Sequence, residues 1–346
     1  MLSVSNATDL RARRGVPGST WFLIAAALLA LHCENLVPAI GSNSAITLVS
    51  NLPSSSAAEE ALVQSFERPI DMVSVEPAFR VERAQVSRLP ALEQARNLVL
   101  LADLSRDDAL VERVVSLVGE DLAARMRAGE RHHVFLTDVW AKGQTLLVVA
   151  AGDAGMLADA VEEHADSIYS VMEKRVTEQT IEVIFMSGEQ ASFSRYLRQQ
   201  YGWSIRVPRG YRVSEDAEAR VVRLWMPEGG TRLVMVHWQD GVHRLPVVES
   251  AIDLRARLVW SYDEDTILRD RTRSNHDPFE GRRALNLEGV WQNERYTKGG
   301  PFRTHFFLEG DRLYMIDLLV FDPENPKINL MRQAEAIALT FTHGEG

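Results

Sequence analysis

The chain contains a single cysteine, Cys33, so no intramolecular disulfide can hold its fold together. The fold must therefore depend on burial of apolar side chains. Of the 346 residues 46% are apolar, which is enough for a sizeable core. The length predicts one large domain or two modest ones. The formal net charge of -10 puts no positive field on the surface, which argues against nucleic acid as a partner.

The segment before Cys33 has the layout of an export signal. Arginines at positions 11, 13 and 14 precede an apolar run from Trp21 to Leu31. Because a membrane-spanning helix needs about 20 apolar residues, this shorter run is better interpreted as the core of a signal peptide that covers residues 1–32.

The six residues that end at Cys33, Leu-Leu-Ala-Leu-His-Cys, resemble the lipobox of bacterial lipoproteins. In that motif the signal is cut before a cysteine that then receives a diacylglycerol. His32 departs from the small residue that usually precedes the cysteine. The alternative is a signal cut elsewhere and a thiol without a special role. Lipidation of Cys33 is the favoured interpretation, and it predicts a membrane partner reached through acyl chains.

The rest of the chain alternates irregularly between helical and strand-like patterns. Hairpins outnumber βαβ units, so the expected class is α+β, with largely antiparallel sheets, packed helices and two sub-domains. An approximate boundary near residue 200 divides the chain into an N-terminal half at 33–200 and a C-terminal half at 201–346. The expected helices are 58–67, 107–127, 153–175, 182–200, one that follows Pro246, and 325–341. The expected hairpins or meanders are 133–150, 219–238 and 285–321.

No catalytic motif or metal-binding pattern emerges. The chain lacks Gly-x-Ser-x-Gly, Ser-x-x-Lys and His-Glu-x-x-His, and residues 152–155 lack the third glycine of a dinucleotide loop. His132 and His133 are neighbours on a strand and point to opposite faces, so two unrelated roles are expected. His164 falls on the inward stripe of its helix, which favours a hydrogen-bonded core residue. The sequence therefore indicates no cofactor, no metal and no class of enzyme.

Two segments place a tryptophan beside an unusual backbone path. Trp140 ends a strand next to a turn, and Trp291 precedes two glycines and a proline. One interpretation is that the indoles cover sheet edges and the glycines serve a turn. The other is a recognition surface of rigid aromatic side chains on loops. The candidate binding residues are Asp138, Trp140, Lys142, Trp291, Gly299, Gly300, Pro301 and Phe302.

These segments, taken in their order along the chain, resemble a known family. The matching residues are Cys33 with 38–41, then 138–142, Tyr201 to Tyr211, Trp225, and Trp291 with 299–302. Together they are similar to uncharacterised envelope lipoproteins of Gram-negative bacteria, catalogued as domain of unknown function 4837. The resemblance covers nearly all of the chain after the leader. It implies export, a lipid on Cys33 and an envelope location, and it implies no catalytic residue.

Two hypotheses of function follow. The favoured one is a lipid-anchored cell-envelope protein that faces the periplasm from either membrane and acts as a binding or assembly module for an envelope protein or glycan. The alternative is a hydrolase acting on an envelope polymer, with groups such as Asp138 and His276 meeting in a cleft. Converging titratable groups would favour the enzyme, whereas an apolar patch would favour the binding module.

Overall fold

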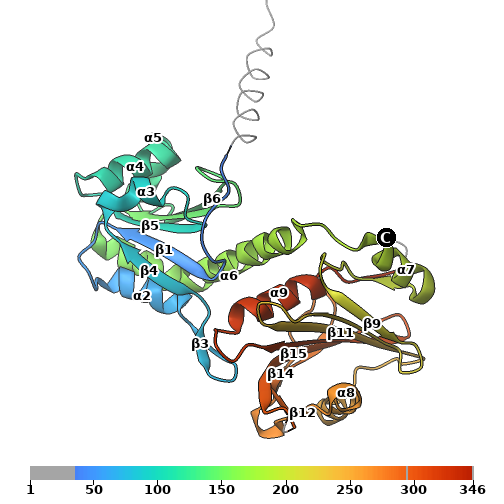
Figure 1. Ribbon diagram of the computed structural model, residues 1–346. Coiled ribbons are helices and arrows are strands. Elements are labelled where there is room, and N and C mark those ends of the chain that lie inside the picture. Colours follow the sequence, from blue (N-terminus) through green and yellow to red (C-terminus); the bar gives the residue numbers. More distant parts are fainter. Residues whose placement is uncertain (1–35, 294, 345–346) are drawn as a thin grey trace, which may run out of the picture.

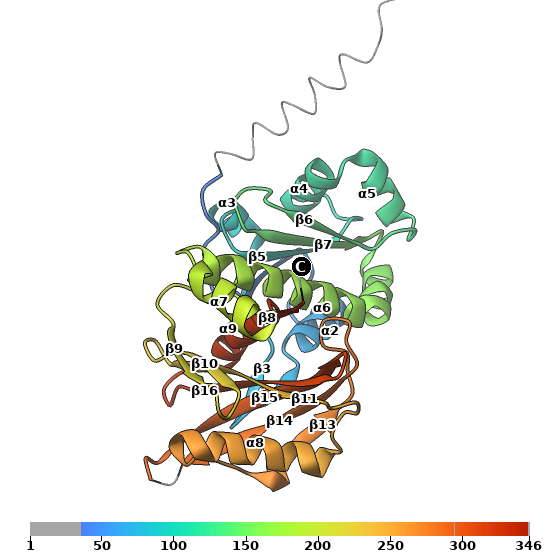
Figure 2. The same ribbon diagram turned by 90° about the vertical axis from the view of Figure 1, so that its right-hand side faces the viewer.

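Two β-sheets of different character are stacked in this protein, each with helices of its own (Figure 1). The computed structural model describes residues 36–293 and 295–344. From one end of the molecule to the other, helices, the smaller sheet, more helices, the larger sheet and one last helix follow each other as layers (Figure 2). Cys33 and the predicted signal peptide at 1–32 lie outside the described residues.

The smaller sheet has a parallel centre. Its order is β4-β1-β5-β7-β6, and every neighbouring pair is parallel except β6 with β7. All residues of β5 and β7 are buried, because central parallel strands carry helices on both faces. The strands are β1 (Ala45–Ser50), β4 (Arg80–Ala84), β5 (Asn97–Asp103), β6 (His133–Thr137) and β7 (Thr145–Ala151).

Helices cover both faces of the smaller sheet (Figure 2). On one face lie α2 (Ala57–Phe66) and α6 (Ala154–Phe185). On the other lie the 3-10 turn η2 (Val86–Arg88), α3 (Leu89–Leu92), α4 (Ala109–Val118) and α5 (Glu120–Arg127). Although α6 has 32 residues, neither it nor another helix in the described ranges carries an apolar stretch that could cross a bilayer.

Glycines explain where the helices depart from the sequence prediction. The helix predicted at 107–127 is split into α4 and α5, because Gly119 adopts a φ of 82° that an ordinary side chain disfavours. The helix predicted to end at 175 continues to Phe185, and Gly188, with a φ of 101°, separates it from α7 (Ala191–Tyr201). The hairpin predicted at 133–150 is confirmed as β6 and β7.

The larger sheet is antiparallel in each of its described pairings, in the order β12-β14-β15-β16-β11-β10-β9 with β13 beside β14. It contains the hairpin and the meander predicted at 219–238 and 285–321. Its strands are β9 (Arg212–Asp216), β10 (Val221–Met226), β11 (Thr231–Asp240), β12 (Thr266–Ile267), β13 (Arg273–Asn275), β14 (Ala284–Asn293), β15 (Lys298–Glu309) and β16 (Arg312–Phe321).

The two faces of the larger sheet have different covers. The inner face packs against α7, α9 (Ile328–Ala338) and the short pair β8 (Trp203–Ser204) and β17 (Thr342–His343). The outer face packs against α8 (Val248–Asp263), which lies at the far end of the molecule from the smaller sheet (Figures 1 and 2). The 3-10 turn η3 (Arg269–Arg271) follows α8 and β12.

The predicted α+β class, with largely antiparallel pairing and two sub-domains, is confirmed. The parallel centre of the smaller sheet was not predicted, because parallel neighbours are joined by long crossovers that leave no local turn signal. The sequence-predicted boundary lies near residue 200. The preceding helix α7 already packs with the larger sheet through Leu197.

Charged contacts join the two halves. The carboxylate of Glu76, on β3 (Val75–Pro77), accepts hydrogen bonds from the backbone N–H groups of Lys327 and Ile328 at 2.8 and 3.1 Å. Glu76 therefore caps the N-terminus of α9 from the other half. The strand that pairs with β3 is β2 (Pro69–Asp71). Further ion pairs across the boundary are Arg332 with Glu173 and Arg271 with Asp71.

Candidate functional site

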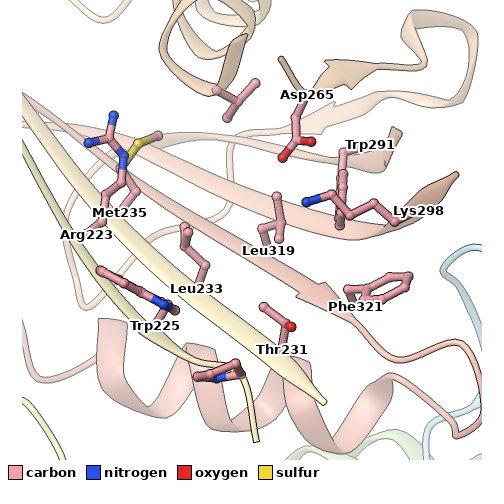
Figure 3. A pocket seen from close by; sticks show the side chains of 12 residues that line it. Arg223, Trp225, Thr231, Leu233, Met235, Asp265, Trp291, Lys298, Leu319 and Phe321 are labelled. Atoms are coloured by element: carbon pink, nitrogen blue, oxygen red, sulfur yellow. The ribbon is translucent and has the colours of Figure 1, made fainter. Parts of the chain in front are cut away.

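A cavity of about 220 Å³ lies on the outer face of the larger sheet, beside the last turns of α8 (Figure 3). Three aromatic side chains, Trp225, Trp291 and Phe321, form part of its wall. Aliphatic residues fill most of the remainder, and three charged residues stand around them. The lining residues are Arg223, Trp225, Pro227, Thr231, Leu233, Met235, Val259, Asp265, Trp291, Lys298, Leu319 and Phe321.

Strand alternation builds this wall. Successive side chains of a strand point to opposite faces, so Leu233 and Met235 on β11 face the cavity while Val234 between them joins the inner core. On β16, Leu319 and Phe321 line the cavity, and Val320 faces inward. These strands therefore supply two apolar faces, which is why β11 is apolar from Leu233 to Val236 and β16 from Leu318 to Phe321.

A hydrogen bond and a neighbouring glycine fix the position of Trp291. Its side chain is buried, and its indole Nε1–H donates to the carbonyl oxygen of Val320 at 3.2 Å. Gly300 is its cross-strand partner. A Cβ atom on Gly300 would lie 1.9 Å from that same carbonyl oxygen and 3.0 Å from the indole nitrogen. Gly300 therefore makes room for the ring that forms one wall of the cavity.

The charged residues occupy different sides of the cavity. Figure 3 shows Asp265 and Lys298 near Trp291, with Arg223 at the opposite end beside Met235. One carboxylate oxygen of Asp265 accepts a hydrogen bond from the amide of Asn293 at 2.8 Å. The ammonium of Lys298 lies 5.9 Å from the centre of the Trp291 ring. The cavity thus combines apolar walls with charges of both signs.

A buried ion pair fixes α8 over the sheet next to the cavity. Arg255 on α8 and Asp317 on β16 are both fully buried, with Nε to Oδ1 at 2.6 Å and Nη2 to Oδ2 at 3.1 Å. The hydroxyl of Thr304 donates to Asp317 at 2.6 Å, and the guanidinium carbon lies 3.5 Å from the centre of the Phe302 ring. Val259, one turn after Arg255, is therefore held at the cavity wall.

A larger hollow of about 940 Å³ lies between the two halves, and several of its polar side chains bond to neighbouring backbone and side-chain groups. Glu76 caps α9, and the guanidinium of Arg96 donates to the carbonyl oxygens of Ala39 and Gly41 at 3.0 Å each. Asp322 accepts from the backbone and the side chain of Asn325. This hollow lacks the aromatic walls of the smaller cavity.

Comparison with protein families divides the chain at the end of α6. Residues 190–340 match the model of a domain of unknown function, DUF4837. We call residues 190–340 the DUF4837 domain. Residues 39–185 match another domain of unknown function, DUF8532. The family resemblance, expected over nearly all of the chain after the leader, is thus confirmed for the second half, while 138–142 belong to the other model.

Comparison with individual proteins adds little. No curated protein matches the chain. A crystal structure from Bacteroides thetaiotaomicron aligns with a TM-score of 0.27 and 12% identity, over 42% of this chain and 46% of that one. LpqN, described as involved in cell envelope biogenesis of Mycobacterium tuberculosis, aligns with a TM-score of 0.28 and 13% identity, over 41% of this chain and 83% of that one. The chain spans under half of the first of these structures.

The predicted residues of the DUF4837 domain lie on strands and not in a loop, Trp291 on β14 and Gly299 to Phe302 on β15. The expected turn at 299–302 is wrong, because Gly299 to Phe302 pair with β14 from Gln292 to Gly289. Pro301 is buried without leaving the strand, and Phe302 packs beneath Arg255. A Cβ on Gly299 would lie 2.8 Å from the carbonyl oxygen of Trp291. The two glycines therefore permit a close strand approach, and only Trp291 of the predicted set lines the cavity.

Asp138, Trp140 and Lys142 lie in the other half, in the connection between β6 and β7. Asp138 has a φ of 52°, and its carboxylate accepts a hydrogen bond from the backbone N–H of Gly143 at 2.6 Å. The Trp140 ring lies under the guanidinium of Arg113, at 4.7 Å. The structure therefore does not bring the two predicted tryptophan segments together into one recognition surface.

The histidines are arranged differently from the prediction. His164 lies with its ring centre 5.4 Å from those of both His132 and His133, so the three rings cluster and do not have unrelated surroundings. Burial, followed by the charges of His164, Arg131 and His132, lowers the pKa of His133. No group of metal-ligating side chains within the described ranges has a geometry that could hold an ion.

Asp138 and His276 do not form the cleft suggested for a hydrolase. Asp138 belongs to the half with the smaller sheet, whereas His276 lies beside β14 with its Nδ1 3.3 Å from the carbonyl oxygen of Ala284. Sequence reasoning also missed Arg255 and Asp317. The acid Asp317 inside the apolar run from Leu313 to Phe321 could have indicated such a pair, since a buried carboxylate needs a cationic or hydrogen-bonding partner.

Proposed function

We propose that this chain is an exported, lipid-anchored envelope protein that acts by binding, and that the cavity of its DUF4837 domain receives an apolar group of the ligand. The cavity is the observation that carries the binding role. An apolar cavity of about 150 Å³ is large enough to take benzene, so 220 Å³ accommodates an aromatic ring or a short acyl chain. The lipobox-like sequence at Cys33 supports the anchor.

The chemistry of the wall favours binding over catalysis. Trp225, Trp291 and Phe321 offer rigid aromatic surface, which binds without losing much side-chain freedom. Lys298 and Asp265 stand on the side of Trp291, where a polar end of the ligand would meet them. Binding sites of this kind combine apolar walls with a few placed polar groups. The proposed ligand is thus an amphipathic group, apolar at one end and polar or charged at the other.

Binding can be tested with small probes on the mature chain. Octanoate, octylamine and indole share an apolar body and differ in charge, so titration with each, followed by nuclear magnetic resonance, measures both occupancy and charge preference. The expected result is saturable binding of at least one probe, with shifts confined to residues around the cavity. Absence of saturable binding by all three would contradict the proposed role of the cavity.

A matched pair of variants locates the binding. Thr231→Trp fills the cavity from β11, whereas Thr177→Trp makes the same change on α6, at a residue that is also half-buried. The first variant is expected to abolish probe binding and the second to leave it unchanged. Equal binding by both would place the probes elsewhere on the molecule.

The anchor is tested separately. Intact mass of the membrane-extracted protein is expected to show a chain beginning at Cys33 with acyl chains attached. Cys33→Ala is expected to remove that mass and to release the chain from the membrane fraction. A chain that retains residues 1–32 and remains in the cytosol would contradict export.

A further inference from the structure

The chain enters its fold beside the connection between β6 and β7. The backbone N–H of Ala39 donates to the carbonyl oxygen of Lys142 at 2.9 Å, and the N–H of Lys142 donates to the carbonyl oxygen of Val37 at 2.9 Å. Arg96 also donates to the carbonyl oxygen of Ala39. Residues from Val37 onward are thus bonded to the folded body, and Cys33 stands only four positions earlier in the sequence.

An amphipathic surface surrounds this point of entry. We call Val37, Trp140 and Lys142 the entry surface. Val37 is 49% exposed, although its side chain is large and apolar. Trp140 is half-buried, and Lys142 is exposed. Tryptophan, aliphatic and lysine side chains together are typical of segments at a membrane–water boundary, where apolar bodies meet lipid and charged ends stay in water.

Trp140 is fixed in place by its neighbours. The guanidinium of Arg113 lies over its ring at 4.7 Å, and Arg113 forms an ion pair with Glu93. The backbone N–H of Trp140 donates to the side-chain oxygen of Gln144 at 3.1 Å. The entry surface is therefore a preformed feature of the fold.

We infer that the entry surface lies against the lipid bilayer, an inference that rests on the proposed lipid at Cys33. Four residues span at most about 14 Å. A domain of about 150 residues has a radius of gyration of about 15 Å, so its diameter is well over twice that reach. A body tethered so closely cannot turn its far side to the membrane. The short segment between Cys33 and Val37 therefore keeps the surface around Val37 against the bilayer.

The orientation of the rest of the molecule follows. Both views show the first described residues at the end with β6, and α8 at the opposite end beyond the larger sheet (Figures 1 and 2). The cavity beside α8 then faces away from the bilayer. The ligand then binds to the cavity from the aqueous side, at a distance from the lipid.

Site-directed labelling measures this orientation. Because Cys33 is the single cysteine of the chain and its thiol is consumed by lipidation, a second cysteine can be labelled selectively. Lys142→Cys places a fluorescent nitrobenzoxadiazole label on the entry surface. Glu249→Cys places the same label on α8, at a carboxylate side chain that is 81% exposed. The lipidated full-length proteins are reconstituted in vesicles of phosphatidylethanolamine and phosphatidylglycerol that contain a headgroup nitroxide quencher.

The label at 142 is expected to be quenched at least several-fold more strongly than the label at 249. Equal quenching at both positions, in protein shown by mass to be lipidated and by flotation to be vesicle-bound, would overturn the orientation and leave the anchor intact. A chain that neither gains the lipid mass nor floats would instead overturn the anchor, and the orientation with it. Val37→Ser is expected to reduce quenching at 142 without releasing the lipidated chain.

Discussion

The two sheets differ in how completely their faces are covered, and the difference locates the candidate site. Helices lie on both faces of the smaller sheet, and its central strands β5 and β7 are buried at every residue. The larger sheet has one helix, α8, on its outer face, and a cavity remains beside the end of that helix. A closed sandwich provides stability, whereas a face with a partial cover leaves apolar surface available to a ligand.

The largest effect is expected from breaking the ion pair that holds this partial cover in place. Asp317→Ala leaves the buried guanidinium of Arg255 without its carboxylate, so the free energy of unfolding should fall by about 3–5 kcal/mol. Urea denaturation measures the change. The exposed pair of Arg269 and Asp253 is the control, and Asp253→Ala should cost less than about 1 kcal/mol.

Replacing both partners of the buried pair sharpens this test. Arg255→Met with Asp317→Leu removes both charges and keeps apolar volume, so most of the lost stability should return. If the double variant is as unstable as Asp317→Ala, the two side chains contribute to the free energy of unfolding through their shape and not through their paired charges.

The second effect concerns the wall of the cavity. Gly300→Ala brings a methyl group within 1.9 Å of the carbonyl oxygen of Val320, so strand β15 or the Trp291 ring must shift. The expected cost is about 1–3 kcal/mol, as for overpacking in a core, with a change in tryptophan fluorescence and weaker probe binding. Gly155→Ala, in the first turn of α6, is the control and should cost less, because a Cβ there meets only the side-chain oxygen of Asp153, at 3.2 Å.

The third effect concerns the junction between the two sheets. Glu76→Ala removes the carboxylate that caps α9 from the other half, and the cost should be about 1 kcal/mol, as for other helix caps. Hydrogen exchange of the amides of Lys327 and Ile328 should become faster. Ser56→Ala removes a cap inside the smaller half and should leave exchange at those two amides unchanged. Unchanged exchange in Glu76→Ala would mean that solvent replaces the cap without loss.

The smallest effect is a pH dependence that the histidines of the two halves should share. Burial lowers the pKa of His133 beside the smaller sheet and of His237 on β11 of the larger one. Each histidine therefore takes up a proton more readily in the unfolded chain, whose pKa is about 6.5. The free energy of unfolding should decrease as the pH falls below about 6.5 and be fully retained above it.

His133→Phe tests the contribution of the three-ring cluster. The variant should lose less stability than the parent between about pH 7.5 and about pH 5, because its proton uptake on unfolding is smaller. Denaturant titrations at the two pH values measure the difference. An unchanged difference would assign the acid sensitivity to His237 or to other groups.

Sequence patterns predicted the elements of this fold better than their arrangement. The hairpins at 133–150 and 219–238 have local turns and alternating strands, so both could be read directly. The parallel neighbours β1, β4 and β5 are joined through helices, and nothing in the sequence marks which strands meet. Gly119 ends a helix that its apolar stripe alone would have continued.

The candidate site was predicted only in part, for similar reasons. Trp291 and Gly300 stand out in the sequence, but their pairing across β14 and β15 depends on strand register. Arg255 and Asp317 are 62 residues apart, so their pairing is a property of the packed fold. The cavity itself is space left between α8 and the sheet. Such a space has no residue pattern of its own.

The ending of α6 at Phe185 has an evolutionary consequence. The two family models stop and start on either side of residues 186–189, directly after this helix. Genes that recombine at this junction would exchange one complete module for another without cutting a sheet. A newly joined domain would have to form again the contacts that Glu76, Asp71 and Glu173 make across the junction. Lineages in which these acids are inherited together with the residues they contact should therefore be those in which the two domains were joined long ago.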